Sequence, residues 1–303
     1  MVNDGSDDDT DMVAERFKGK ILYIYKSNGG VGSARNAGVR AASGKYVLFL
    51  DADDLLHPDA VGWLVDAVGD GEDRLSVMGW TDFTKTPGDR PNADKYPSAS
   101  ASLAEQLLTG DIPAVHSYLV SRHAVCASGG FDETLPSCED WDLWLRLVVF
   151  GEIHVGSVRR VGAYYRRYPG SKSTNGMQVD MAAYKILLRC LRRLQTPSRP
   201  EWLSGQAYRN TIGVLRRDVF TAAFDTAKGL RLEGRYWESA RWLWRSIRYG
   251  RTSLSCKSLA AAAWQKAIPS RFRAASWFPA GTESARQAVT VLGKTLREHR
   301  SRD

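Results

Sequence analysis

A run of apolar residues that ends in three carboxylates constrains the fold of this chain more than any other feature. Residues 46–50 read Tyr-Val-Leu-Phe-Leu, and Asp51, Asp53 and Asp54 follow directly. An apolar run without alternation predicts a parallel strand that is buried on both faces. Because the ligands of open α/β sheets bind at the carboxyl ends of strands, we expect these carboxylates to line a binding site. The alternative is a simple turn that starts a helix, since Pro58 suits a first helical position.

The spacing of these carboxylates also indicates a cation. Acidic side chains this close together repel one another unless a positive charge lies between them. Hard oxygen ligands suit Mg²⁺ or Mn²⁺, and such an ion in turn holds phosphate oxygens. The strand end therefore predicts a divalent-metal site for a phosphorylated ligand.

A glycine-rich segment, residues 28–38, precedes this strand. Its first three glycines, the last of which is Gly32, allow a tight loop and close approach of the backbone to a ligand. Ser33 is the expected N-cap of a short helix over residues 34–42. Arg35 then lies in the first helical turn, where a cation opposes the helix dipole, so we expect it to meet an anion or a nucleobase. The alternative is an ordinary surface arginine, and the segment is neither a Walker loop nor a Gly-x-Gly-x-x-Gly loop.

Five short segments of acidic, glycine and aromatic residues follow one another in the first 175 residues. In this order they resemble the signatures of family 2 glycosyltransferases. Each segment alone has little specificity, and fold analogy alone does not fix a function, so the interpretation rests on the site residues. The segments are residues 2–10, residues 32–38, residues 49–54, residues 129–133 with 139–147, and residues 164–167 with Ser171 and Ser173.

The resemblance implies a fold class, a donor and a metal. The fold is a GT-A-type α/β nucleotide-binding sandwich with a mostly parallel sheet, here residues 1–175, followed by an α-helical domain, residues 176–303. The donor is a nucleotide sugar, UDP-linked or related, and the cofactor is Mg²⁺ or Mn²⁺. The resemblance assigns Asp4, Arg35, Asp51, Gly32 and Arg166 to nucleotide-sugar binding, Asp53 and Asp51 to the metal, and Asp140 and Glu139 to catalysis.

The chemistry of sugar transfer agrees with these roles. A departing nucleoside diphosphate builds up negative charge, which a metal ion stabilises as a Lewis acid. The attacking hydroxyl of the acceptor loses a proton, which the Asp140 carboxylate can accept. A single base opposite the leaving group predicts one displacement and inversion at the anomeric carbon. Glu139 is the second candidate for this base.

Asp140 also fits a purely structural role. Residues 137–140 read Ser-Cys-Glu-Asp, which fits a capping box with Ser137 as the N-cap of a helix. Carboxylates in a first helical turn are favoured by the helix dipole and are therefore less basic. The two interpretations are compatible, because a helix start can also direct a carboxylate into a cleft.

The chain departs from the family pattern at its first residue. The family begins with a strand, a helix and a second strand, and Met1 here lies near the end of that second strand. We expect either a start codon placed too far downstream or a true truncation. The first is favoured, because a sheet without a central strand exposes backbone groups and apolar faces. A chain that lacks one wall of the nucleotide pocket is expected to bind donor weakly or not at all.

Charge divides the chain into two parts. Residues 1–175 carry 18 Lys and Arg against 25 Asp and Glu, a net charge of −7. Residues 176–303 carry 24 against 9, a net charge of +15. The basic part predicts an anionic partner, either a membrane surface or a polyprenyl-phosphate acceptor, or else solvated arginines on helices. Nucleic acid is an unexpected partner, since no binding motif for it is present.

The basic part reads as helical. Apolar stripes predict helices over residues 181–194, 204–233 and 236–249, with a break near Gly229 in the second. Its tryptophans either face a membrane interface or pack in the interior. These tryptophans are Trp237, Trp242, Trp244, Trp264 and Trp277.

Between the two main motifs, the sequence predicts the remainder of the sheet. A helix is expected over residues 58–68, a strand over 75–80 and a polar loop over 84–102. A further strand over residues 116–120 carries His116, which we expect in the core or facing the cleft. Such loops usually determine the choice of acceptor.

These features together predict an inverting glycosyltransferase of cell-surface polysaccharide or glycolipid assembly. No apolar run reaches the roughly 18 residues of a membrane span and no signal peptide is evident, so we expect a cytoplasmic protein, peripheral on the inner face of the membrane. One alternative is a sugar-phosphate nucleotidyltransferase, although its glycine-rich loop and phosphate lysine are not evident. Another is an inactive, truncated homologue that acts as an interaction or membrane-surface protein through its basic helices.

Overall fold

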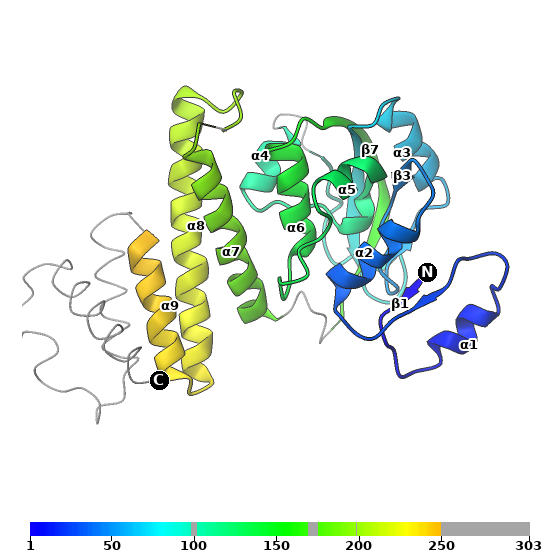
Figure 1. The fold of residues 1–303 in the computed structure, drawn as a ribbon, viewed down its shortest axis with the longest axis horizontal. Coiled ribbons are helices and arrows are strands. Elements are labelled where there is room, and N and C mark those ends of the chain that lie inside the picture. Colours follow the sequence, from blue (N-terminus) through cyan, green and yellow to red (C-terminus); the bar gives the residue numbers. More distant parts are fainter. Residues whose placement is uncertain (98–101, 169–174, 198, 250–303) are drawn as a thin grey trace, which may run out of the picture. The chain divides into compact units, whose positions relative to one another are not determined.

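The computed structural model of the chain describes residues 1–97, 102–168, 175–197 and 199–249 (Figure 1). The chain divides into two compact units, Met1–Thr174 and Asn175–Asp303. Several residues singled out from the sequence lie outside the described residues, namely Ser171, Ser173, Trp264 and Trp277.

The described strands of the first unit form two sheets. A small sheet pairs β1 with β2 in parallel, and a five-stranded sheet has the order β3-β6-β5-β7-β4. The two longest strands, β5 and β7, lie side by side near its centre. The strands are β1 (Val2–Asn3), β2 (Ile24–Tyr25), β3 (Tyr46–Val47), β4 (Leu55–Leu56), β5 (Arg74–Phe83), β6 (Tyr118–Ser121) and β7 (His154–Arg166).

The predicted fold class is confirmed, but the predicted strand direction is wrong. Only β5 and β7 pair in parallel within the larger sheet, whereas β3–β6, β5–β6 and β4–β7 are antiparallel. The expectation rested on the apolar run at residues 46–50, which predicts burial but carries no information about the direction of its neighbour. In the structure, Tyr46 and Val47 of this run pair with β6, which runs against both β3 and β5.

Short helices connect and cover these strands. The last of them, α6, continues directly into one π-helical turn, η2, and π-helical turns are rare and often lie near functional sites. The helical elements are α1 (Thr10–Glu15), α2 (Val31–Ala41), α3 (Ala60–Val68), α4 (Leu103–Leu108), the 3₁₀ turn η1 (Val115–Ser117), α5 (Arg122–Ala127), α6 (Glu139–Trp144) and η2 (Leu145–Val149).

The main core lies between α3 and the five-stranded sheet. Ala60, Leu64 and Val68 recur every four residues, so they lie on one face of α3. This face packs against Met78 and Trp80 of β5 in one buried cluster. The packing holds β5 and its neighbour β7 in place, and the carboxyl ends of these two strands carry site residues.

The described part of the second unit is helical, and its helices lie close to the ranges that the apolar stripes predict. Its helices are α7 (Gly176–Leu194), α8 (Gly205–Leu232) and α9 (Tyr236–Tyr249), and α8 contacts both of the others. The break predicted near Gly229 is wrong, since α8 continues through it. One glycine in a helix costs only about 1 kcal/mol, which packing against a neighbouring helix can offset.

The interior of the second unit is apolar and aromatic. Leu187 of α7 and Leu215 and Val219 of α8 are buried, and the ring of Tyr184 meets the buried Trp242 edge-on. Trp242 therefore packs in the interior, which was one of its two predicted roles. Within the described part of the chain, no helix combines the length and apolarity that a membrane span requires.

Candidate functional site

The first predicted site residue, Asp4, lies where β1 ends beside the glycine-rich loop. Its Oδ1 accepts hydrogen bonds from the Gly29 backbone N–H at 3.0 Å and from Lys26 Nζ at 2.6 Å. Burial acts to raise the pKa of Asp4, but the bonds from Lys26 and the loop amides outweigh it and lower the pKa. Asp4 is therefore an ionised carboxylate at the mouth of this loop.

The helix after the loop begins earlier than expected. Gly30 is the N-cap of α2, with a φ of 86°, and Ser33 lies within the helix. Ser33 was expected to be the N-cap, but a glycine adopts positive φ without strain, so the chain can turn into the helix at Gly30. Arg35 consequently lies in the second helical turn, further from the positive end of the helix dipole.

Arg35 joins residues from three separate parts of the sequence. Its Nη2 donates to both oxygens of Asp51, each at 2.8 Å, and its Nη1 donates to Glu139 Oε1 at 2.6 Å. The Arg35 and Glu139 side chains are each 9% exposed. The three side chains and the neighbouring Asp140 are called the Arg35 cluster below.

Asp140 is the least compensated member of the Arg35 cluster. Its Oδ1 accepts the backbone N–H of Trp141 at 2.7 Å. Burial, followed by the negative charge of Glu139, raises the pKa of Asp140 to about 6, although Arg35 acts in the opposite direction. The same carboxylates outweigh the effect of burial on Arg35 and raise its pKa. The cluster thus holds one cation and an excess of carboxylates.

A left-handed residue directs the start of α6. Cys138, the N-cap, has a φ of 59°. Among the residues that the structure describes, every other residue with a positive φ is a glycine. The capping box expected with Ser137 as N-cap is wrong, because the helix begins at Glu139 and Cys138 provides no side-chain cap. A side chain in this conformation is strained, and such strain gathers at functional sites.

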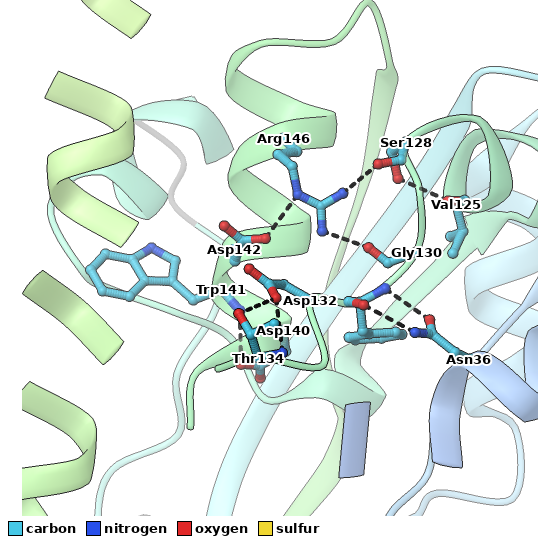
Figure 2. Close-up of polar contacts among 11 residues, drawn as sticks. Asn36, Val125, Ser128, Gly130, Asp132, Thr134, Asp140, Trp141, Asp142 and Arg146 are labelled. Atoms are coloured by element: carbon cyan, nitrogen blue, oxygen red, sulfur yellow. Dashed lines mark hydrogen bonds and ion pairs between the residues drawn. The ribbon is translucent and has the colours of Figure 1, made fainter. Parts of the chain in front are cut away.

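Hydrogen bonds from Arg146 connect α6 with the loop that precedes it, as Figure 2 shows. Arg146 donates to Asp142 at 2.8 Å and to the carbonyls of Ser128 and Gly130 at 2.7 and 2.6 Å. These bonds fix the helix that carries Asp140 to the loop that precedes it. Sequence reasoning missed this role of Arg146, although its spacing of four residues from Asp142 was a usable signal.

The same loop is tied to α2 through Asn36, which sequence reasoning also missed. Asn36 Nδ2 donates to the carbonyl of Phe131 at 3.0 Å, and Phe131 N–H donates back to Asn36 Oδ1 at 2.8 Å (Figure 2). A Cβ at Gly130 would lie 2.5 Å from Asn36 Oδ1, and one at Gly32 would lie 3.6 Å from Glu139. The glycine at position 130 therefore allows α2 to approach the loop closely, whereas a Cβ at position 32 would make an ordinary contact with α6.

A second group of charged side chains lies at the carboxyl end of β7. Arg166 donates from its backbone N–H to Asp54 Oδ1 and from Nε to the carbonyl of Asp53, each at 2.8 Å. Asp54 Oδ2 lies 3.1 Å from His116 Nδ1, and both side chains are buried. These four residues are called the Asp54 cluster below. His116 thus lies in the core, one of its two predicted locations, and Asp54 is a buried partner rather than an open ligand.

Asp51 and Asp53, the two expected metal ligands, differ in how far their carboxylates are already engaged. Among the described residues, no group of three or more His, Cys, Asp or Glu side chains is arranged to hold a metal ion. Both oxygens of Asp51 are engaged by Arg35, whereas Asp53 is half-buried and its carboxylate, by its charge and a hydrogen bond, raises the pKa of Tyr168. Because Mg²⁺ is commonly bound by one or two carboxylates together with substrate phosphates, Asp53 fits such an ion as a single protein ligand. Asp51 in this arrangement does not.

Asp82 is a further charged residue of this rim that sequence reasoning missed. It is 2% exposed at the carboxyl end of β5, where its carboxylate pairs with Arg167 at 3.1 Å and Lys95 at 3.8 Å. Lys95 is also joined to Trp80 by two backbone hydrogen bonds. Asp82 therefore anchors part of the polar loop expected over residues 84–102, and its position inside an apolar strand was the available signal.

Comparison with known proteins gives one family and several relatives. The family model described as glycosyl transferase family 2 matches residues 1–124. An uncharacterized glycosyltransferase of Rickettsia prowazekii is 30% identical over 164 residues, which are 51% of this chain and 50% of that protein. A chondroitin synthase of Pasteurella multocida is 34% identical over 156 residues, which are 50% of this chain and 16% of that protein. The matched segments thus span half or less of the length of these relatives.

Solved structures match over nearly the whole chain. The crystal structure of S. aureus TarS residues 1–349 in complex with UDP-GlcNAc has a TM-score of 0.56 and 15% sequence identity, and the match covers 98% of this chain and 82% of that one. The corresponding complex with UDP has a TM-score of 0.54. At this level of identity, the likeness concerns the fold.

Proposed function

We propose that this chain, whose residues 1–124 match the glycosyl transferase family 2 model, transfers a sugar from a nucleotide-sugar donor to a hydroxyl group of a saccharide or lipid-linked acceptor, with inversion. The observation that carries the proposal is the meeting of three signature segments at one point. Arg35, Asp51 and Glu139 come from different segments, and their side chains bond to one another beside Asp140.

The donor site is assigned to the glycine-rich loop and its surroundings. Asp4 is an ionised acceptor beside Gly29, and it suits the N–H groups of a nucleobase. The proposed donor is a UDP-sugar, which is supported by the TarS complexes with UDP and UDP-GlcNAc. Gly32 leaves room beside Glu139, and Arg166 holds the backbone of Asp53 in place.

A divalent ion, Mg²⁺ or Mn²⁺, is proposed to bind Asp53 and the diphosphate of the donor. When bound, it would stabilise the negative charge of the leaving nucleoside diphosphate. Asp51 has a different proposed role, because its two oxygens hold Arg35. The chain's own contribution at this edge is to fix Asp53 through the bond from Arg166 to its carbonyl.

Asp140 is the proposed general base. The acceptor O–H bond breaks and its proton passes to the Asp140 carboxylate. The freed oxygen bonds to the anomeric carbon, while the nucleoside diphosphate leaves with the electron pair of the old bond. A base is most effective when its pKa lies near the working pH, and the pKa of Asp140 is raised to about 6.

The acceptor and the place of action are proposed from charge and from relatives. Residues 176–303 carry a net charge of +15, which suits an anionic membrane surface or a polyprenyl-phosphate acceptor. Chondroitin and hyaluronan synthases are among the relatives, which supports a role in polysaccharide synthesis for the cell surface. We accordingly place the protein in the cytoplasm, peripheral on the inner face of the membrane.

The test is release of UDP from UDP-sugars by the full chain, with and without Mn²⁺, together with calorimetric binding of UDP. The wild type is expected to bind UDP and to release it faster with Mn²⁺, and Asp53→Ala is expected to lose the response to Mn²⁺. Asp66→Ala, which removes an exposed carboxylate of α3, is the matched control. A chain that neither binds UDP nor releases it from any UDP-sugar would support the inactive homologue instead.

A further inference from the structure

The Arg35 cluster contains one cation and three carboxylates. The Arg35 guanidinium donates two bonds to Asp51 and one to Glu139. Among the hydrogen bonds of the described residues, none from Arg35 reaches Asp140, whose partner is the N–H of Trp141. If all three carboxylates are ionised, the cluster has two uncompensated negative charges in a largely buried place. Such a cluster favours a proton on its least compensated member.

The Arg35 bond makes the two neighbouring carboxyls of α6 unequal. Glu139 Oε1 accepts a charge-assisted bond at 2.6 Å from a permanently charged group, so this oxygen is already occupied. An oxygen that already accepts a hydrogen bond from Arg35 is poorly placed to accept a second one from an acceptor hydroxyl. Asp140 has the negative Glu139 beside it and lacks this bond, so it is the better base of the two.

We propose that Arg35 is a positioning residue that binds Glu139 and Asp51 and thereby leaves Asp140 as the group that takes the proton of the acceptor hydroxyl. The inference rests on the function proposed above and deepens it. It removes Arg35 from the residues that contact the nucleotide. It also makes Glu139 a partner of Arg35 rather than a second base.

The electrostatics of the site agree with this geometry. Burial and the charge of Glu139 raise the pKa of Asp140, and the charge of Arg35 lowers it. Charges of opposite sign on Glu139 and Arg35 therefore act on one carboxyl from two elements. The titratable and charged groups that face Asp140 or its neighbours are Glu139 on α6, Arg35 on α2, Asp51 after β3, the Tyr118 hydroxyl on β6 and, acting on Tyr118, Asp111 before η1.

The test is a pH titration of the Asp140 carboxyl in the full chain, labelled with ¹³C at the aspartate side-chain carboxyl and observed by NMR. The signal is assigned by its loss in Asp140→Asn. Glu139→Gln removes a neighbouring negative charge and is expected to lower the titration midpoint by about one pH unit. Arg35→Gln removes the cation and is expected to raise the midpoint by about one unit. Glu152→Gln removes an exposed carboxylate of the same unit and should leave the midpoint unchanged.

Opposite shifts in the two variants support the proposal. Shifts in the same direction, or an unchanged midpoint in Glu139→Gln, would overturn it. Arg35→Lys covers the case in which Arg35→Gln does not fold, because lysine keeps the charge but cannot bridge two carboxylates as a guanidinium does. A small upward shift is expected for this variant, and a downward shift would count against the proposal.

A second readout separates this inference from the proposed function. In the assay of UDP release from UDP-GlcNAc, the acid limb of the pH profile should move with the NMR midpoint, to lower pH in Glu139→Gln and to higher pH in Arg35→Gln. An active wild type in which neither the NMR midpoint nor the acid limb moves in the Glu139→Gln variant contradicts the inference alone. A wild type without UDP release, with the expected NMR shifts intact, contradicts the proposed function alone.

Discussion

The Arg35 cluster and the Asp54 cluster are both partly buried groups of ionisable side chains in the first unit, but their carboxylates have different surroundings. In the Asp54 cluster, one buried carboxylate has a backbone N–H on one oxygen and an imidazole 3.1 Å from the other. In the Arg35 cluster, one guanidinium serves Asp51 and Glu139 while Asp140 is left with a raised pKa. A carboxylate enclosed by structural neighbours mainly contributes to stability, whereas one whose pKa is raised is a candidate for proton transfer.

The largest expected effect tests the reactive side of this comparison. Asp140→Asn keeps the shape of the side chain but cannot accept a proton, so transfer should fall by about 10²- to 10⁴-fold while the chain stays folded. The measurement is initial rate at saturating donor, with circular dichroism as the check on folding. Glu152→Gln should retain the wild-type rate. Full activity in Asp140→Asn would exclude it as the base.

The next effect tests the structural side. His116→Leu removes the imidazole that lies 3.1 Å from the buried Asp54 Oδ2, and leaving this oxygen without a polar neighbour should lower the free energy of unfolding by about 1–3 kcal/mol. Urea denaturation measures the change. The double variant Asp54→Asn/His116→Leu should lose less than the sum of the two single variants, since both act on one interaction. Additive losses would show that the two side chains do not stabilise each other.

The pH dependence of stability distinguishes the clusters further. Asp140 has a folded pKa of about 6 against an ordinary value of 3.8, so between these pH values the folded state binds more protons than the unfolded state. This contribution to stability is therefore present below about pH 4 and lost as the pH rises to 6. Asp140→Asn should consequently be more stable than the wild type at pH 8, by at most about 3 kcal/mol, and equal to it near pH 4. Thermal unfolding across this range measures the difference, and a variant that is less stable at pH 8 contradicts the assignment.

The smallest expected effect concerns the strained entry to α6. Cys138→Gly should raise stability by about 1 kcal/mol at most, because glycine adopts the left-handed conformation without the clash of a Cβ. Cys126→Ala, at an exposed position of α5, is the control and should change little. If Cys138→Gly keeps its stability but loses activity, the side chain rather than the backbone conformation serves the reaction.

The candidate residues were largely accessible to sequence reasoning, and their contacts were not. The acidic strand end, the glycine-rich loop and the segment around Asp140 are local patterns, and the helices of the second unit follow from apolar spacing. The prediction of strand direction was wrong because a buried run is equally apolar beside a parallel or an antiparallel neighbour. The predictions of Ser33 and Ser137 as N-caps were wrong, because the chain turns into the two helices at Gly30 and Cys138 instead. Both residues have a positive φ, which the preference of serine for cap positions does not predict.

The sequence alone determined which carboxylates lie at the ends of which elements, since strand burial, loop glycines and helix starts depend on neighbours along the chain. Only the tertiary structure decided that Arg35 binds Asp51, 16 residues away, and Glu139, 104 residues away. The physical reason is that a guanidinium shielded from water forms hydrogen bonds with the carboxylates that the packing of other elements places beside it. The proton affinity of Asp140 depends on that packing, and local sequence does not encode it.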